Sequence, residues 1–191
     1  MKRLSLFFLT ITLILSGCGS QKSQRPANWN DSWTIVSPIL AIETPAEFSL
    51  NEANDTLSVS GIYYATWVTG DERSHTNEDG ESATVYDAQI YVLVQEFRTG
   101  EKAEKEAAQW AERAKQSYET AKPDTWEQDG QQYTLLPLAS GSESNPYGHG
   151  IVAYTVRGEF AVWVELLCTS DYESDPRQVL EQFLAGFHFS E

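Results

Sequence analysis

The chain has 191 residues, of which 41% are hydrophobic and 21% charged, a composition typical of one globular domain rather than of a disordered or repetitive protein. Its formal net charge is −15, and no cluster of Lys and Arg follows the first three residues, which excludes nucleic acid as an expected partner. The same charge would repel anionic lipid headgroups, so any hold on a membrane has to come from an anchor.

The N-terminal segment has the parts of a signal peptide. Lys2 and Arg3 give a basic start, the apolar run 4–15 follows, and small residues come after it. The run is too short for a transmembrane helix, which needs about 20 residues. We therefore expect residues 1–17 to be a signal peptide that is removed after export.

The four residues Leu15-Ser16-Gly17-Cys18 resemble the lipobox of bacterial lipoproteins. The resemblance implies cleavage before Cys18 and diacylglycerol on its sulfur, and two or more acyl chains hold a protein stably on a bilayer. An ordinary secretory leader with a chance cysteine is the alternative. We expect residues 18–31 to be the lipidated N-terminus and a flexible tether, on the extracytoplasmic side of the cell membrane or outer membrane.

Residues 32–191 are expected to form a single α+β domain with a mainly antiparallel sheet and two amphipathic helices. Segments 157–159 and 69–83 separate apolar runs and are expected to connect hairpins. The expected strands, in chain order, are 46–50, 57–68, 84–97, 132–138, 150–156 and 160–168, with 33–42 as a further candidate.

Both helices are predicted from apolar residues spaced three and four apart. The first is expected at 100–121, before Pro123, with Trp110 on its apolar face. The second begins at a cap on Ser174 or Asp175. Its apolar stripe comprises Val179, Leu180, Phe183, Leu184 and Phe187.

This order of strands, helix, strands and C-terminal helix is similar to the Mog1/PsbP-like α/β/α sandwich over about 140 residues. The resemblance implies an architecture and favours a binding role, because members of that group serve as adaptors, photosystem subunits and envelope lipoproteins. It rests on no diagnostic motif, so it carries over no site residues.

Catalytic signals are missing from the sequence. Phosphate-binding, dinucleotide, zinc-protease and nucleophile-elbow motifs are absent. The acidic loop 70–83 partly matches a calcium loop, but His75 and Tyr86 stand where carboxylates are required. The remaining histidines, His149 and His188, are far apart in the chain. We expect no catalytic residues, no metal site and no cofactor.

Cys168 and the aromatic residues are the remaining candidates. With Cys18 acylated, Cys168 has no disulfide partner, and its apolar strand predicts a buried, inert thiol. Aromatic residues make up 12% of the chain. Helices covering both sheet faces would bury them, with Trp110 packed on one face and Trp163 facing the other layer. Otherwise an exposed platform would bind a ligand through Tyr63, Trp67, Tyr91 and Trp163.

The sequence therefore predicts a lipid-anchored, noncatalytic binding or interaction domain. Its partners would be the membrane, through Cys18, and an envelope protein, a peptide or a glycan. An envelope-associated hydrolase is the first alternative and requires a histidine and a carboxylate in one cleft. A structural or assembly accessory is the second, and is favoured by one broad apolar patch.

Overall fold

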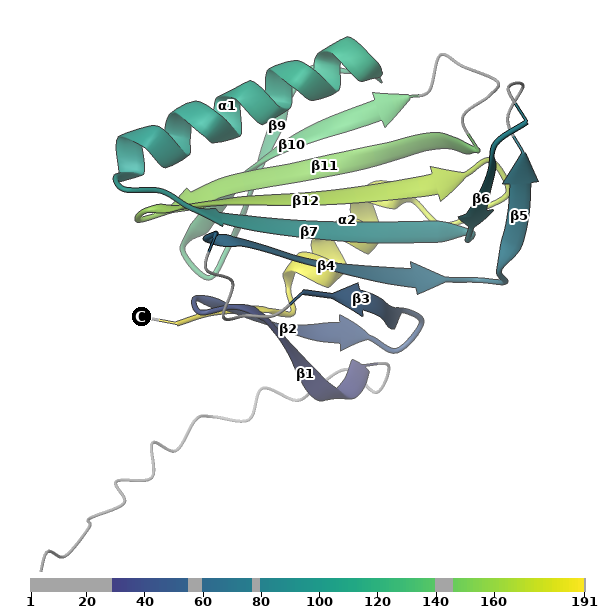
Figure 1. Cartoon of the computed structure of the whole chain (residues 1–191), viewed down its shortest axis with the longest axis horizontal. Coiled ribbons are helices and arrows are strands. Elements are labelled where there is room, and N and C mark those ends of the chain that lie inside the picture. Colours follow the sequence, from purple (N-terminus) through teal and green to yellow (C-terminus); the bar gives the residue numbers. More distant parts are fainter. Residues whose placement is uncertain (1–28, 55–59, 77–79, 140–145, 191) are drawn as a thin grey trace, which may run out of the picture.

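A computed structural model of the chain describes residues 29–54, 60–76, 80–139 and 146–190 (Figure 1). The predicted signal peptide, the lipobox with Cys18 and most of the tether lie outside the described residues. The elements are β1 (Trp29–Ser37), β2 (Leu40–Pro45), β3 (Ser49–Ala53), β4 (Ile62–Thr69), β5 (Arg73–Thr76), β6 (Ser82–Val85), β7 (Ala88–Glu96), α1 (Gly100–Ser117), β8 (Glu119–Thr120), β9 (Asp124–Gln128), β10 (Gln131–Ala139), β11 (Tyr147–Arg157), β12 (Phe160–Thr169), α2 (Pro176–Leu184) and β13 (Phe187–Phe189).

The strands form one large antiparallel sheet and two small ones. The main sheet has eight strands in the order β3-β4-β7-β12-β11-β10-β8, and β9 pairs with β10. The sheet β1-β2-β13 has three strands, and β5 and β6 form a separate hairpin. These pairings confirm the predicted α+β class, the hairpin β11-β12 and the wide hairpin β4-β7.

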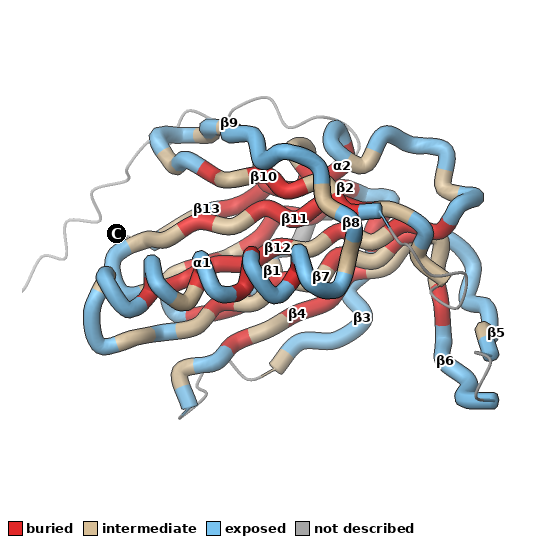
Figure 2. The backbone as a smooth tube through the Cα atoms, turned by 90° about the horizontal axis from the view of Figure 1, so that it is seen from above, coloured by how far each residue is buried: buried red, intermediate tan, exposed pale blue. Residues whose placement is uncertain are grey.

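The two helices pack on opposite faces of the main sheet (Figure 1). Side chains alternate along β12, so Val162 and Val164 join the core cluster that contains the α2 residues, whereas Trp163 joins the α1 cluster. Ile42 of β2 and Phe187 of β13 also belong to the α2 cluster, so the three-stranded sheet shares that face with α2. Figure 2 shows the resulting buried centre of the sheet and the exposed outer side of α1.

Local signals fix where the helices begin. The Thr99 side chain accepts a hydrogen bond from the Lys102 amide at 3.4 Å, and Asp175 caps α2 by accepting from the Arg177 amide at 2.9 Å. The first helix ends at Ser117, earlier than predicted, because the chain continues into β8 and pairs with β10. No helix in the described part of the chain is both long and apolar enough to span a membrane.

Several predicted boundaries are wrong because of local turns. Segment 33–42 is divided between β1 and β2, and 84–97 is divided between β6 and β7. The strand predicted at 46–50 begins only at Ser49, since the Phe48 amide closes a turn onto the Pro45 carbonyl at 3.0 Å. Phe187 belongs to β13 and not to the second helix, and β1 includes residues predicted as tether.

Candidate functional site

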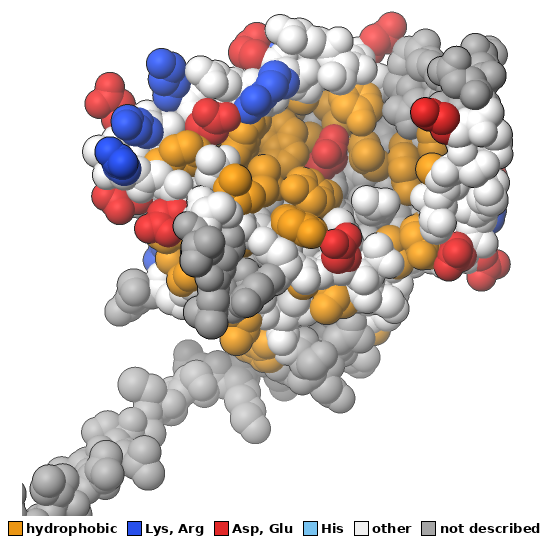
Figure 3. Space-filling view, viewed as in Figure 1, with side chains coloured by type: hydrophobic (Ala, Val, Ile, Leu, Met, Phe, Trp, Pro, Cys, Tyr) orange, Lys and Arg blue, Asp and Glu red, His pale blue; other side chains and the backbone are white. Residues whose placement is uncertain are grey.

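The face of the main sheet that carries α1 is only partly covered. The helix lies over β11 and β12, and side chains of the same face on β4 and β7 remain partly exposed. Figure 3 shows hydrophobic side chains gathered on this side of the molecule below α1. We call this surface the open sheet face, and its apolar members are Ile62, Tyr64, Val68, Tyr91 and Leu93.

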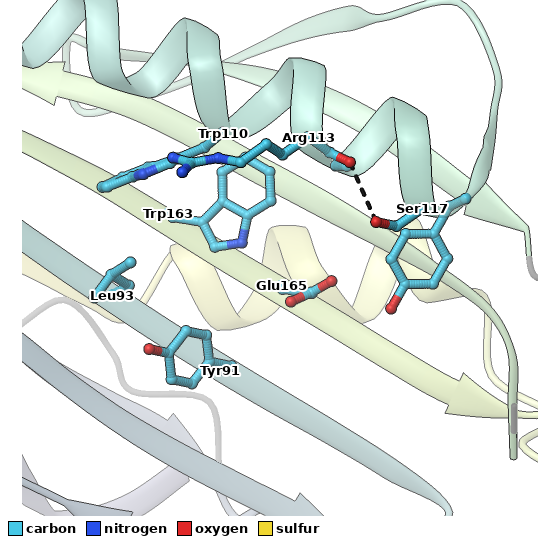
Figure 4. Close-up of a pocket in the computed structure, with 9 residues that line it drawn as sticks. Tyr91, Leu93, Trp110, Arg113, Ser117, Trp163 and Glu165 are labelled. Atoms are coloured by element: carbon cyan, nitrogen blue, oxygen red, sulfur yellow. Dashed lines mark hydrogen bonds between the residues drawn. The ribbon is translucent and has the colours of Figure 1, made fainter.

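A groove of about 230 Å³ lies where α1 meets the open sheet face. We call it the α1 groove (Figure 4). It is lined by Tyr91 and Leu93 of β7, by Trp163 and Glu165 of β12, by Trp110, Arg113, Ala114 and Ser117 of α1, and by Tyr118 directly after the helix.

The aromatic floor of the groove is held in place by ring contacts. Trp110 meets Trp163 edge to face with the ring centroids 6.1 Å apart, and Tyr154 stacks beside Trp163 at 6.0 Å. Both tryptophans are nearly buried, with exposed fractions of 9% and 7%. The floor is therefore fixed before any ligand arrives, which lowers the entropy cost of binding.

Strand register places the acidic side chain of the groove, Glu165, beside the aromatic side chain of Tyr91. Across β12 and β7, Glu165 pairs with Tyr91 and Trp163 pairs with Leu93. Directly paired residues of antiparallel strands project on the same face, so the Glu165 carboxylate stands on the groove side of the sheet. Figure 4 shows it between Tyr91 and the helix.

The environment of Glu165 disfavours its charged form. Burial raises the pKa of the Glu165 carboxyl, and a hydrogen bond donated by the Trp163 indole N–H opposes that rise without cancelling it. No cationic side chain in the described ranges forms an ion pair with Glu165. Arg113 also lines the groove, but it is paired with Glu106 at 2.7 Å.

Tyrosines continue the aromatic surface from the groove onto the open sheet face. The rings of Tyr64 and Tyr91 are 6.2 Å apart, and the Tyr64 hydroxyl donates to Glu52 at 2.9 Å. Burial raises the pKa of the Tyr91 hydroxyl, with smaller contributions from nearby Tyr64, Glu165 and Glu52. Tyr91 therefore remains a neutral hydrogen-bonding group at the mouth of the groove.

The structure separates the four aromatic residues of the alternative platform. Tyr91 and Trp163 line the α1 groove. Tyr63 and Trp67 lie on the opposite face in the core, with exposed fractions of 4% and 1%, as expected for a sheet covered on both faces, so they do not belong to the alternative exposed platform. The physical reason is that α2 docks there, and its Phe183 packs edge-on against Trp67 at 5.2 Å.

Trp163 also differs from its expected position. Trp163 lies under α1, the helix that carries Trp110, and its ring contacts the Trp110 ring rather than facing the other layer. Sequence reasoning missed Glu165 and Arg113 as groove residues. The available signal for Glu165 was a single carboxylate inside the apolar run 160–168.

The histidines and Cys168, the other candidate functional residues, do not gather at one site in the structure. His75, His149 and His188 lie on β5, β11 and β13, and none lines the α1 groove. Among the residues described, no three His, Cys, Asp or Glu side chains gather as metal ligands. The Cys168 thiol is buried, and burial raises its pKa to about 12.

Comparison with known proteins supports the fold. No family model and no curated protein matches the sequence. The solution structure of cyanobacterial PsbP (CyanoP) from Synechocystis is similar, with a TM-score of 0.50 and 13% identity over 91% of this chain and 99% of that one. A crystal structure from Bacteroides thetaiotaomicron gives a TM-score of 0.38 and 10% identity over 80% of this chain and 45% of that one. The chain therefore has a PsbP-like fold.

Proposed function

We propose that this chain is a lipid-anchored, extracytoplasmic lipoprotein whose domain is noncatalytic and binds its ligand or partner in the α1 groove. The observation that carries the proposal is a preformed aromatic groove open to solvent in an otherwise acidic molecule. Concave apolar sites with a few polar groups are the usual form of ligand sites. We also propose the α/β/α sandwich as its architecture, supported by helices on opposite sheet faces.

The residues around the groove support binding rather than hydrolysis. The alternative hydrolase site requires a histidine and a carboxylate that converge on one reacting bond. Among the residues that the structure describes, Glu165 is the one carboxylate that lines the groove, and no histidine lines it. Its neighbours are aromatic and aliphatic side chains, which contribute buried surface and shape rather than proton transfer.

A photo-crosslinking amino acid at Ser117 tests occupancy of the groove in intact cells. Ser117 is exposed and lines the groove, whereas the adjacent Gln116 is exposed but does not line it and serves as the matched control. We expect an adduct from position 117 and not from 116, and its loss when Leu93→Arg places a long cationic side chain in the groove. Equal adducts from both positions, or none from 117, would overturn the proposal.

Anchoring is tested separately with Cys18→Ala. Wild-type protein should incorporate a palmitate analogue and the variant should not, because the variant lacks the sulfur that accepts the lipid. Equal labelling of both proteins would contradict the proposed lipidation. The label is preferable to detergent partitioning, because an uncleaved apolar leader also retains protein on membranes.

An assembly-accessory role is the second candidate, and the open sheet face favours it. This surface adjoins the groove and carries partly exposed Tyr64, Tyr91 and Leu93. Contiguous exposed apolar surface often marks a protein interface. Recovery of a protein adduct through both Ser117 and a crosslinker at Tyr64 would favour this role, whereas an adduct through Ser117 alone favours a small ligand.

A further inference from the structure

We propose that the α1 groove recognises a small organic cation, a substituted ammonium group on a short apolar stem, with Glu165 as its counter-charge. This inference deepens the proposed function and rests on it, because it takes the groove to be the binding site. Three features carry it: an acid without a cationic partner, aromatic walls around that acid, and the small size of the groove.

The first feature is the electrostatic state of Glu165. A carboxylate that is partly removed from water loses hydration, and without a nearby positive charge this loss is not compensated. The Trp163 indole N–H supplies one hydrogen bond, and the pKa of Glu165 is still raised. A cation in the groove would provide the missing charge, and an anion would be repelled.

The described part of the chain does not supply that charge to Glu165. Arg113 is the basic residue that lines the groove, and its guanidinium is bound to Glu106 at 2.7 Å. Its side chain is 61% exposed, so it stands at the rim and in solvent rather than over the carboxylate. Glu165 is therefore available to an external cation.

The aromatic side chains that line the groove also favour a cationic ligand. Tyr91 pairs with Glu165 across β7 and β12, and Tyr118 also lines the groove beside α1, whereas Trp163 presents its N–H edge to the carboxylate. The faces of such rings carry negative potential and attract substituted ammonium ions, which shed their hydration more readily than a metal ion does. A neutral apolar ligand would bury the carboxylate without compensation.

The size of the groove limits the ligand. Sites for drug-sized molecules enclose roughly 300 to 1,000 Å³. The α1 groove encloses about 230 Å³, which suits a trimethylammonium head and a few carbon atoms. Its open side continues onto Leu93 and Tyr91, where a short stem can lie.

The test compares two esters that differ only in charge, 2-(trimethylammonio)ethyl acetate and its uncharged carbon isostere 3,3-dimethylbutyl acetate. Tryptophan fluorescence and calorimetry on the mature wild-type protein measure binding. We expect the cation to bind about tenfold more tightly than the isostere, as a cation–π and charge contribution of the usual size predicts. Equal affinity for both esters would overturn the inference.

Variants identify the residue responsible. Glu165→Gln should weaken binding of the cation about tenfold and should not weaken binding of the isostere, because the substitution keeps the shape and removes the charge. Glu112→Gln, on the exposed side of α1 and paired with Lys115, is the matched control and should bind as wild type. Unchanged affinity in Glu165→Gln would contradict the assignment.

A wild-type measurement covers the case in which Glu165→Gln fails to fold. A bound cation stabilises the carboxylate, so an NMR titration should show the pKa of Glu165 fall when the charged ester is added. Binding should likewise weaken as the pH falls through that pKa. A pKa that does not move, or binding of an arginine-rich peptide but not of the charged ester, would refute the inference.

The crosslinking experiment separates the two proposals. An adduct at Ser117 without any preference for the charged ester would leave the groove as a binding site and refute only its cation selectivity. The absence of both would refute the proposed function as well.

Discussion

Trp67 and Trp33 have the same side chain in opposite surroundings. Trp67 is 1% exposed and packs on Phe183 of α2, whereas Trp33 on β1 is 47% exposed. We expect Trp67→Ala to lower the free energy of unfolding by roughly 3 to 5 kcal/mol, through lost burial and an unfilled cavity. Trp33→Ala should change it by less than about 1 kcal/mol. Equal midpoints for the two variants in urea would contradict the two-sided core.

Gly70 combines a left-handed backbone with a steric contact. Its φ is +85°, and an added Cβ would lie 2.0 Å from a carboxylate oxygen of Asp87, which is paired with Arg73. Gly130 also has a positive φ, of +75°, but nothing lies within 4 Å of its Cβ position. Gly70→Ala should therefore lower the free energy of unfolding more than Gly130→Ala does. Gly130→Ala adds only the strain of a left-handed backbone, about 1 kcal/mol. Thermal unfolding of both variants measures the difference.

The start of α2 is a capped helix end whose contribution can be measured. Asp175 accepts a hydrogen bond from the Arg177 amide, and Pro176 occupies the first turn. Removing the cap with Asp175→Ala should cost roughly 0.5 to 2 kcal/mol. Asp175→Asn retains the acceptor and should cost less. Chemical denaturation distinguishes them, and identical losses would show that the side chain does not act as a cap.

An ion pair joins β9 to α2 and gives a pH-dependent contact. Arg177 binds Asp124 at 2.7 Å, and this bond lowers the pKa of the Asp124 carboxyl. A lowered folded-state pKa means that the contact stabilises the fold above the unfolded pKa and is lost as the pH falls through the folded pKa. In Arg177→Gln, an NMR titration should show the Asp124 pKa rise toward its ordinary value. An unchanged titration would contradict the pair.

Local sequence patterns predict the helices and many of the strands, but not how these elements pack and pair with one another. Both helices follow from the spacing of residues such as Ala103 and Val179 and from their caps, which act within one turn. The short strand β13 carries no such signal, because its Phe187 continues the helical spacing and only pairing with β2 makes it extended. Burial of Trp67 and placement of Glu165 beside Tyr91 depend on register across distant strands, which sequence alone does not specify.

The reactivity of the Cys168 thiol depends on the folding of the whole molecule, because the thiol is exposed only when the sheet and α2 separate. The thiol has no exposed surface, and burial raises its pKa to about 12. A thiol reagent should therefore react at a rate that follows unfolding, and the denaturant midpoint should be the same with and without reductant. Fast labelling in native buffer would contradict a closed core, and a midpoint that depends on reductant would indicate pairing between molecules.

In the anchored protein that we propose, β1 is the described strand nearest in sequence to the lipid on Cys18, which favours one orientation of the domain. This strand leads back toward Cys18 and belongs to the small sheet, on the opposite side of the main sheet from α1. Trp33 and Ile35 are exposed on it at 47% and 62%, and tryptophan favours the interface of a bilayer. In a lipidated protein these side chains would lie nearest the headgroups, and the main sheet would stand between the lipid surface and the α1 groove. The groove would then open toward the aqueous compartment and receive solutes from it, rather than lipids from the membrane below.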